Sequence, residues 1–169
     1  MEDLLFHFPL RYQDKTRLSC IGELKEGMDA LVRGTIRASG VARGRRPTLI
    51  VKVDDGTGLV TLRFFHFRRA QAQQLRIGDT ITLFGQPRMV GGSTEFAHPE
   101  YVVGDQEPQL EEALTPVYPV TEGMGQSTMR NLTQQALTYL MKNPPEDLLT
   151  GLPGDSPSIT DSIKFLHRP

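Results

Sequence analysis

Between Asp29 and Val103 the chain carries five segments in which apolar and polar side chains alternate, and this pattern limits the fold more than any other feature. Successive side chains of a β-strand point to opposite faces, so a period of two predicts strands. Turns with glycines separate the segments, and Asp54-Asp55-Gly56-Thr57-Gly58 is the clearest of them. The expected strands cover residues 29–38, 48–53, 59–67, 80–86 and 94–103.

A short helix is predicted between Arg68 and Arg76, after the third strand, and it ends before Gly78. Five strands with a helix in this position match a mainly β fold, the five-stranded Greek-key barrel of the oligonucleotide-binding (OB) type. Gly34 and Gly85 lie inside strands and suit the tight bends of a closed barrel. Another small barrel or sandwich without a role in nucleic-acid binding stays open as an alternative.

The remaining residues divide around this OB-fold domain at 29–103. Residues 1–28 are interpreted as a lead-in segment, and residues 104–126 as an acidic, proline-containing connector. Residues 127–169 carry apolar side chains at helical spacing, with Ser127 as the expected N-cap, and are predicted to form a helical appendage.

The charges are distributed unevenly along the chain. Residues 30–90 hold eleven Lys and Arg against three Asp and Glu, a net charge of +8. The rest holds eight basic and seventeen acidic residues, a net charge of −9, so the overall value of −1 conceals a strong asymmetry. A basic segment within a folded domain indicates a polyanionic partner such as nucleic acid, although a solvated basic surface is the plainer alternative.

Several classes of protein are disfavoured. The single cysteine, Cys20, cannot form an internal disulfide, and no Cys and His residues have the spacing of zinc ligands, so we expect a cytoplasmic protein without a metal site. No apolar run is long enough to cross a membrane, and we expect no membrane partner. The Gly-x-x-x-x-Gly-Lys-Ser/Thr phosphate loop is absent, so neither catalysis nor a cofactor is expected in this chain.

Candidate binding residues cluster at the end of the third expected strand, where aromatic and cationic side chains interleave. Aromatic rings stack on unpaired bases and cations neutralise phosphates, which is the combination that single-stranded nucleic acid requires. Alternation places Phe64 and His66 on one face and Phe65 and Phe67 on the other, and it leaves open which face is exposed and whether all three Phe side chains belong to the core. The candidates in this cluster are Arg63, Phe64, Phe65, His66, Arg68 and Arg69.

Two loops add further candidates. Arg43, Arg45 and Arg46 lie in a glycine-flanked loop between the first two expected strands, where OB folds commonly contact the nucleic-acid strand. Arg88 precedes the expected hairpin tip around Gly91 between the last two strands. Contacts of this kind favour phosphates, so binding is expected to be selective for the structure of the nucleic acid and sensitive to salt.

Several phrases spanning the chain resemble the N-terminal region of the RecG family, bacterial ATP-dependent helicases that remodel stalled replication forks and drive branch migration of Holliday junctions. Their order and spacing make the resemblance specific. The phrases are Phe8-Pro9-Leu10-Arg11-Tyr12-Gln13-Asp14, Asp55-Gly56-Thr57-Gly58 with Leu62-Arg63-Phe64-Phe65-His66-Phe67, His98-Pro99-Glu100-Tyr101, Leu114-Thr115-Pro116-Val117-Tyr118-Pro119 with Thr121-Glu122-Gly123, and Leu166-His167-Arg168-Pro169.

The resemblance implies an OB-fold wedge domain that grips the branch point and helps to split the duplexes. It further implies that motor domains outside this sequence bind ATP and Mg²⁺ and supply translocation, so the chain is expected to be a piece of a longer protein. In the family an aromatic side chain of this strand stacks at the fork junction, which favours Phe64 or Phe65. The expected partners are branched and single-stranded DNA, bound by a monomer.

Two alternatives remain open. OB-type barrels also bind peptides, and the RecG family is associated with the single-strand-binding protein, so the basic groove is also interpreted as a site for that protein's acidic tail. An RNA-binding OB module is the other alternative, which a preference for the 2′-hydroxyl would reveal.

Overall fold

The computed structural model describes residues 2–108, 110–146 and 157–169, and the chain divides into two compact units. One unit combines the residues up to Gln13 with those from Glu112 onward, and the other spans Asp14–Glu111. The second unit is mainly β and extends beyond the expected 29–103 at both ends. The expected lead-in segment, residues 1–28, is accordingly divided between the two units.

The Asp14–Glu111 unit is built on one seven-stranded sheet in the order β6-β7-β4-β3-β2-β5-β8. A 3-10 helix, η1 (Ile21–Glu23), precedes the sheet, and the short helix α2 (Arg69–Gln74) follows β4, which confirms the predicted helix after the third long strand. The strands are β2 (Ala30–Ala42), β3 (Thr48–Asp54), β4 (Leu59–Phe64), β5 (Thr80–Gly85), β6 (Arg88–Val90), β7 (Ser93–Ala97) and β8 (Glu100–Val103).

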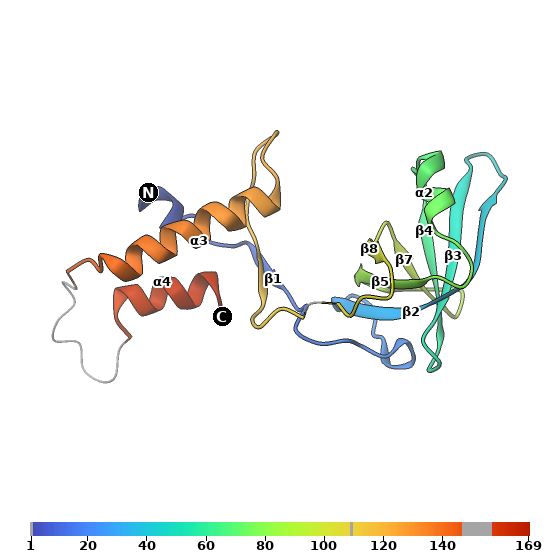
Figure 1. Ribbon diagram of the computed structural model, residues 1–169, viewed down its shortest axis with the longest axis horizontal. Helices are drawn as coiled ribbons and strands as arrows, with labels where there is room; N and C mark the ends of the chain where they lie inside the picture. The colour runs from blue at the N-terminus through green and yellow to red at the C-terminus, as the bar shows by residue number, and fades with distance from the viewer. Residues whose placement is uncertain (1, 109, 147–156) are drawn as a thin grey trace. The chain divides into compact units, whose positions relative to one another are not determined.

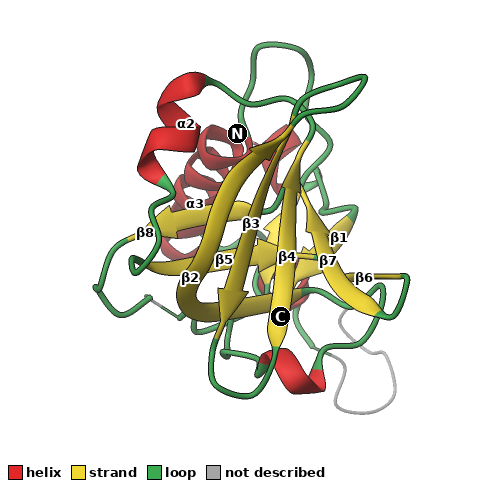
Figure 2. Ribbon diagram, turned by 90° about the vertical axis from the view of Figure 1, so that its right-hand side faces the viewer, coloured by secondary structure: helices red, strands yellow, loops and turns green. Residues whose placement is uncertain are grey.

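Strand β2 bends and pairs with two partners. Its first half pairs antiparallel with β5 and its second half with β3, and the register shifts between Ile36 and Ala38. Figure 2 shows the resulting curvature of β2. At Gly34 a Cβ atom would lie 2.8 Å from the carbonyl oxygen of Asp54 and 2.8 Å from Cγ1 of Val53, so the bend leaves room only for glycine.

The fifth expected strand, residues 94–103, is in fact two strands. β7 pairs parallel with β4, the chain turns at His98 and Pro99, and β8 pairs antiparallel with β5. This one segment therefore contacts both ends of the curved sheet, as the last strand of an OB fold does. Among the described residues no ladder joins the edge strands β6 and β8, so the barrel is not closed by hydrogen bonds.

The core of this unit lies inside the curved sheet. Alternate side chains of the strands are buried there, as the period of two predicts. Leu75, directly after α2, is also buried and attaches the helix to the sheet. The most deeply buried residues are Val32, Ile36, Leu49, Val51, Val53, Val60, Leu62, Ile81, Leu83 and Phe96.

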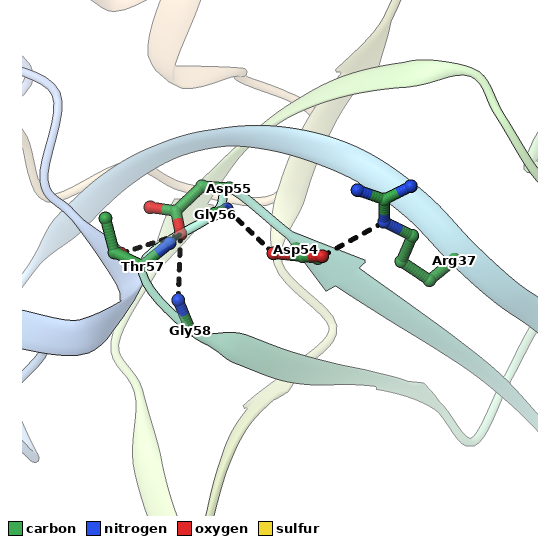
Figure 3. A network of polar contacts seen from close by, with 6 residues as sticks. All are labelled: Arg37, Asp54, Asp55, Gly56, Thr57 and Gly58. Carbon is green, nitrogen blue, oxygen red and sulfur yellow. Dashed lines mark hydrogen bonds and ion pairs between the residues drawn. The ribbon is translucent and has the colours of Figure 1, made fainter.

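The turn between β3 and β4 is held by its two aspartates (Figure 3). Oδ1 of Asp55 accepts hydrogen bonds from the backbone N–H groups of Thr57 and Gly58 and from the Thr57 hydroxyl, and its Oδ2 accepts from the N–H of Ile21 at 2.8 Å. Burial raises the pKa of Asp55, but these hydrogen bonds outweigh it and leave the pKa below its usual value. The pair is therefore turn chemistry, as predicted, and not a catalytic pair of carboxylates.

The other unit joins the two ends of the chain. Its elements are α1 (Glu2–Leu5), β1 (Arg11–Gln13), β9 (Thr115–Val117), α3 (Gln126–Lys142) and α4 (Ile159–His167), and β1 pairs antiparallel with β9. The expected connector, residues 104–126, thus contains a strand. The predicted helices are present, but the N-cap of α3 is Gly125 and not Ser127.

A buried histidine links three parts of this unit. Nε2 of His167 lies 2.9 Å from the carbonyl oxygen of Leu5, and its Nδ1 lies 2.9 Å from the hydroxyl of Tyr118. Burial raises the pKa of Tyr118, so the phenol stays protonated near neutral pH. In the described part of the chain, no helix has both the length and the apolar character of a membrane span.

Candidate nucleic-acid interface

The register of β3 and β4 brings most of the candidate residues to one end of the sheet. Leu49 lies opposite Phe64, so the loop that precedes β3 and the segment that follows β4 are neighbours. Figure 1 shows the β2–β3 loop and α2 at the same end of this unit. We call this region the basic end, and its exposed side chains are Arg43, Arg45, Arg46, Phe65, His66, Arg68 and Arg69.

Phe64 and Phe65 have opposite environments. Phe64 is 2% exposed and belongs to the core, whereas Phe65 is 48% exposed. Phe64 continues the inward alternation of Val60 and Leu62, and a stacking role for it is therefore wrong for this structure. Of the two aromatic candidates, only Phe65 presents its ring to solvent.

Phe67 packs partly buried against the core, although alternation places it on the same face as Phe65. The reason is that β4 ends at Phe64 and not at Phe67, so the period of two no longer applies to the residues that follow. The alternative in which all three Phe side chains form core is also wrong, because Phe65 stays exposed.

Arg63 is engaged within the sheet and is not an open phosphate ligand. Its Nε and Nη2 donate to the two carboxylate oxygens of Glu95 at 2.6 and 2.7 Å, a bidentate pair that joins β4 to β7. This hydrogen bonding raises the pKa of Arg63 further. Its guanidinium is therefore already paired within the sheet, and a direct contact of Arg63 with DNA stays a prediction.

Arg88 is exposed but lies apart from the basic end. In the strand register Arg88 of β6 lies opposite Glu95 of β7, and Glu95 lies beside Thr61 of β4. Arg88 is therefore level with the middle of β4. The hairpin tip at Gly91 lies beyond Ser93, towards the start of β4, whereas Phe65 follows the end of that strand. Arg88 thus remains a prediction for a separate contact.

His98 is a component of the basic end that the sequence analysis missed. It lies between β7 and β8, and its Nε2 accepts a hydrogen bond from the backbone N–H of Phe65 at 3.1 Å. The two ring centroids are 5.6 Å apart. Because this contact depends on the parallel pairing of β7 with β4, no local sequence signal could have identified it.

The chemistry available at the basic end is attraction of phosphates and stacking of bases. Five exposed arginines lie at the same end of the sheet as the exposed ring of Phe65. The described residues include no cluster of three or more His, Cys, Asp or Glu side chains that could hold a metal ion. Stacking on an aromatic ring tolerates any base, so this combination recognises the form of a nucleic acid more than its sequence.

Fold and site together define a class, an OB-type domain with a basic end that carries an exposed aromatic side chain. A family model described as the RecG wedge domain matches residues 1–140, and the chain belongs to this family. The ATP-dependent DNA helicase RecG of Escherichia coli (strain K12) is 41% identical over 172 residues, which is 100% of this chain and 25% of that protein.

More distant relatives agree. The protein of the same name from Pasteurella multocida is 39% identical over 100% of this chain, and that from Aquifex aeolicus is 28% identical over 99%. The chain spans about a quarter of the length of the curated relatives it matches. The structure of RecG bound to a three-way DNA junction superposes with a TM-score of 0.67 at 21% identity, covering 99% of this chain and 24% of that one, which supports the fold.

Proposed function

We propose that this chain is the DNA-binding wedge domain of a RecG-like helicase, which recognises branched DNA such as stalled forks and Holliday junctions and helps to split the duplexes at the junction. The observation that carries the proposal is the basic end, where Phe65 is exposed among the loop arginines and Arg68 and Arg69. The names of the relatives, and the three-way DNA junction bound in the solved RecG structure, support it.

The proposed mechanism is mechanical. The arginines of the β2–β3 loop hold phosphates, and Phe65 stacks on the base exposed at the branch point. Separating one base-pair step costs about 1.4 kcal/mol of stacking, and one aromatic stack returns about 1–3 kcal/mol, so Phe65 offsets the loss locally. Net movement needs the ATP hydrolysis that we assign, with Mg²⁺, to other domains of the full-length protein.

Fluorescence anisotropy tests the proposal with labelled DNA of four forms: a fork, a Holliday junction, a linear duplex and a single strand of matched length. A salt series accompanies each form. The proposal predicts tighter binding to the branched forms at every salt concentration, with a linear fall of log affinity against log salt.

Equal and weak binding to all four forms, abolished by salt, would contradict the proposal and leave only a basic surface. A fork of the same sequence made of RNA serves as the control for the sugar. Tighter binding to that fork would contradict the assignment to DNA.

A further inference from the structure

The backbone conformation of His98 is unusual. Its φ is +49°, and it is the sole non-glycine residue with positive φ in the described part of the chain. A residue with a Cβ atom is strained in this region, and such strain persists where surrounding structure enforces it, often at functional sites. Pro99 follows, and a residue before proline ordinarily adopts an extended conformation, which makes the conformation of His98 more exceptional.

The contacts of His98 account for this conformation. Its own N–H donates to the carbonyl oxygen of Arg63 at 3.0 Å, which extends the β7–β4 pairing by one residue. The turn then carries the imidazole back over the end of β4. There the centroid of the His98 ring lies 5.9 Å from that of Phe64, with the rings edge-on, and 6.1 Å from that of His66, with the rings stacked.

Phe65 depends on this imidazole. As the first residue beyond β4, Phe65 has no ladder partner for its N–H, and Nε2 of His98 supplies the acceptor at 3.1 Å. The centroids of the His98 and Phe65 rings are 5.6 Å apart, and the two ring planes are tilted by 49°. Both the backbone and the ring of Phe65 are thus contacted by one side chain from the turn between β7 and β8.

We propose that His98 is a positioning residue for Phe65, which it fixes in the exposed orientation needed to stack on the base at a DNA branch point. The inference rests on the proposed function and deepens it. His98 acts by restricting the Phe65 backbone and ring before DNA arrives, so less ordering is needed on binding. It touches Phe65 and is not required to touch DNA.

A pair of substitutions separates the hydrogen bond from the backbone strain. In His98→Asn the side chain tolerates positive φ, but its carbonyl oxygen is too short to replace Nε2. In His98→Gln the side-chain oxygen reaches about as far as Nε2 and restores the acceptor. Leu59→Ala is the control, because it removes an exposed side chain at the opposite end of β4 from Phe65.

The first readout needs no DNA. Because Nε2 accepts the Phe65 N–H, the neutral His98 ring carries its proton on Nδ1, the tautomer less common for histidine in solution. Proton–nitrogen NMR of the folded chain is expected to show the Nδ1–H tautomer for His98, and the Phe65 amide signal is expected to shift in His98→Asn and return towards its original position in His98→Gln. An Nε2–H tautomer would overturn the proposal.

The second readout is the preference for a three-way junction over linear duplex. The expected loss in His98→Asn is roughly fivefold or more, approaching that of Phe65→Ala, with partial recovery in His98→Gln and no change in Leu59→Ala. In Phe65→Ala/His98→Asn the loss is expected to equal that of Phe65→Ala alone, because His98 acts through Phe65. Independent, additive losses would overturn the proposal.

The two readouts also distinguish failure of this inference from failure of the proposed function. If Phe65→Ala leaves the junction preference unchanged, stacking by Phe65 is refuted, and the role of His98 in junction binding is refuted with it. If Phe65→Ala abolishes the preference while His98→Asn retains it, the proposed function stands and the positioning role is refuted.

Discussion

Leu49 lies directly opposite Phe64 in the antiparallel pair of β3 and β4, and this single register decides which charges surround the exposed ring of Phe65. The β2–β3 loop, with three arginines, turns immediately before β3, and Phe65 follows immediately after β4. A slip by one residue would turn the side chain of Phe64 out of the core, because successive side chains of a strand face opposite sides. Register, burial and site therefore depend on one another.

Truncation to alanine is expected to lower the stability of the fold strongly at Phe64 and only slightly at Phe65. Phe64→Ala removes a core side chain that is 2% exposed, so the free energy of unfolding should fall by about 3–5 kcal/mol. Phe65→Ala should change it by less than about 1 kcal/mol, because its ring is half exposed. Urea denaturation followed by circular dichroism measures both values. Equal losses would show that Phe65 also belongs to the core.

The β2–β3 loop is expected to bind phosphates without regard to the form of the DNA. Replacing Arg43, Arg45 and Arg46 together with Ala should weaken binding to forks, duplexes and single strands alike. The slope of log affinity against log salt should fall by about 0.7–0.9 for each phosphate that the loop no longer neutralises. Arg88→Ala, in a different part of the sheet, is the single-charge comparison. An unchanged slope in the triple variant would exclude the loop from the interface.

Arg63 is expected to stabilise the fold without contributing to the salt dependence of DNA binding, because both carboxylate oxygens of Glu95 already hold its guanidinium. Arg63→Gln should cost about 1 kcal/mol of stability, the scale of a charged hydrogen bond in a partly exposed place. Anisotropy titrations should show the salt slope of the original chain. A slope reduced as in a loop arginine variant would place Arg63 at the DNA.

The β3–β4 turn should make the fold sensitive to acid through Asp55. Its pKa in the folded state lies below the ordinary value of about 3.9, so its stabilising effect is complete above that value and is lost as the pH falls through the folded pKa. Asp55→Asn should lower stability by about 1–3 kcal/mol at pH 7, because the amide is a weaker acceptor.

Stability measured from pH 7 to pH 2 checks this expectation. The difference between Asp55→Asn and the original chain should begin to shrink as the pH falls below the ordinary value of about 3.9, and it should be lost as the pH falls through the lowered pKa of the folded chain. Asp54→Asn is the comparison, since the Asp54 carboxylate accepts from Gly56 and Arg37 (Figure 3), whereas the bond to Ile21 of η1 is made by Asp55. A difference that stays constant over the whole pH range would contradict the assigned role of Asp55.

Much of the β architecture follows from local pattern. Val60 and Leu62 alternate with the polar Thr61 and Arg63, and extending that period by one step predicts Phe64 inside, so its burial could have been predicted from the residues before it. The end of β4 carries no comparable signal, since the run through Phe67 continues to look like a strand. The position of Phe67 therefore escaped sequence reasoning.

The rest of the site depends on contacts between distant segments. In the sequence Arg63 is an arginine next to aromatic residues. Only the pairing of β7 with β4 shows that its guanidinium is hydrogen-bonded to the carboxylate of Glu95. His98 precedes a proline, which predicts an extended backbone, yet in the turn between β7 and β8 it has a positive φ of +49°. Local propensity does not contain such information, because tertiary pairing determines it.

Recognition of the branch point by Phe65 is tested most directly by the ratio of dissociation constants for linear duplex and three-way junction, compared between the original chain, Phe65→Ala and Leu59→Ala at one salt concentration. Leu59 is the matched control, since it begins β4 and is 49% exposed. We expect Phe65→Ala to lower the ratio roughly fivefold or more, from the loss of one base stack, and Leu59→Ala to preserve it. An unchanged ratio in Phe65→Ala, or an equal fall in both variants, would contradict recognition of the branch point by Phe65.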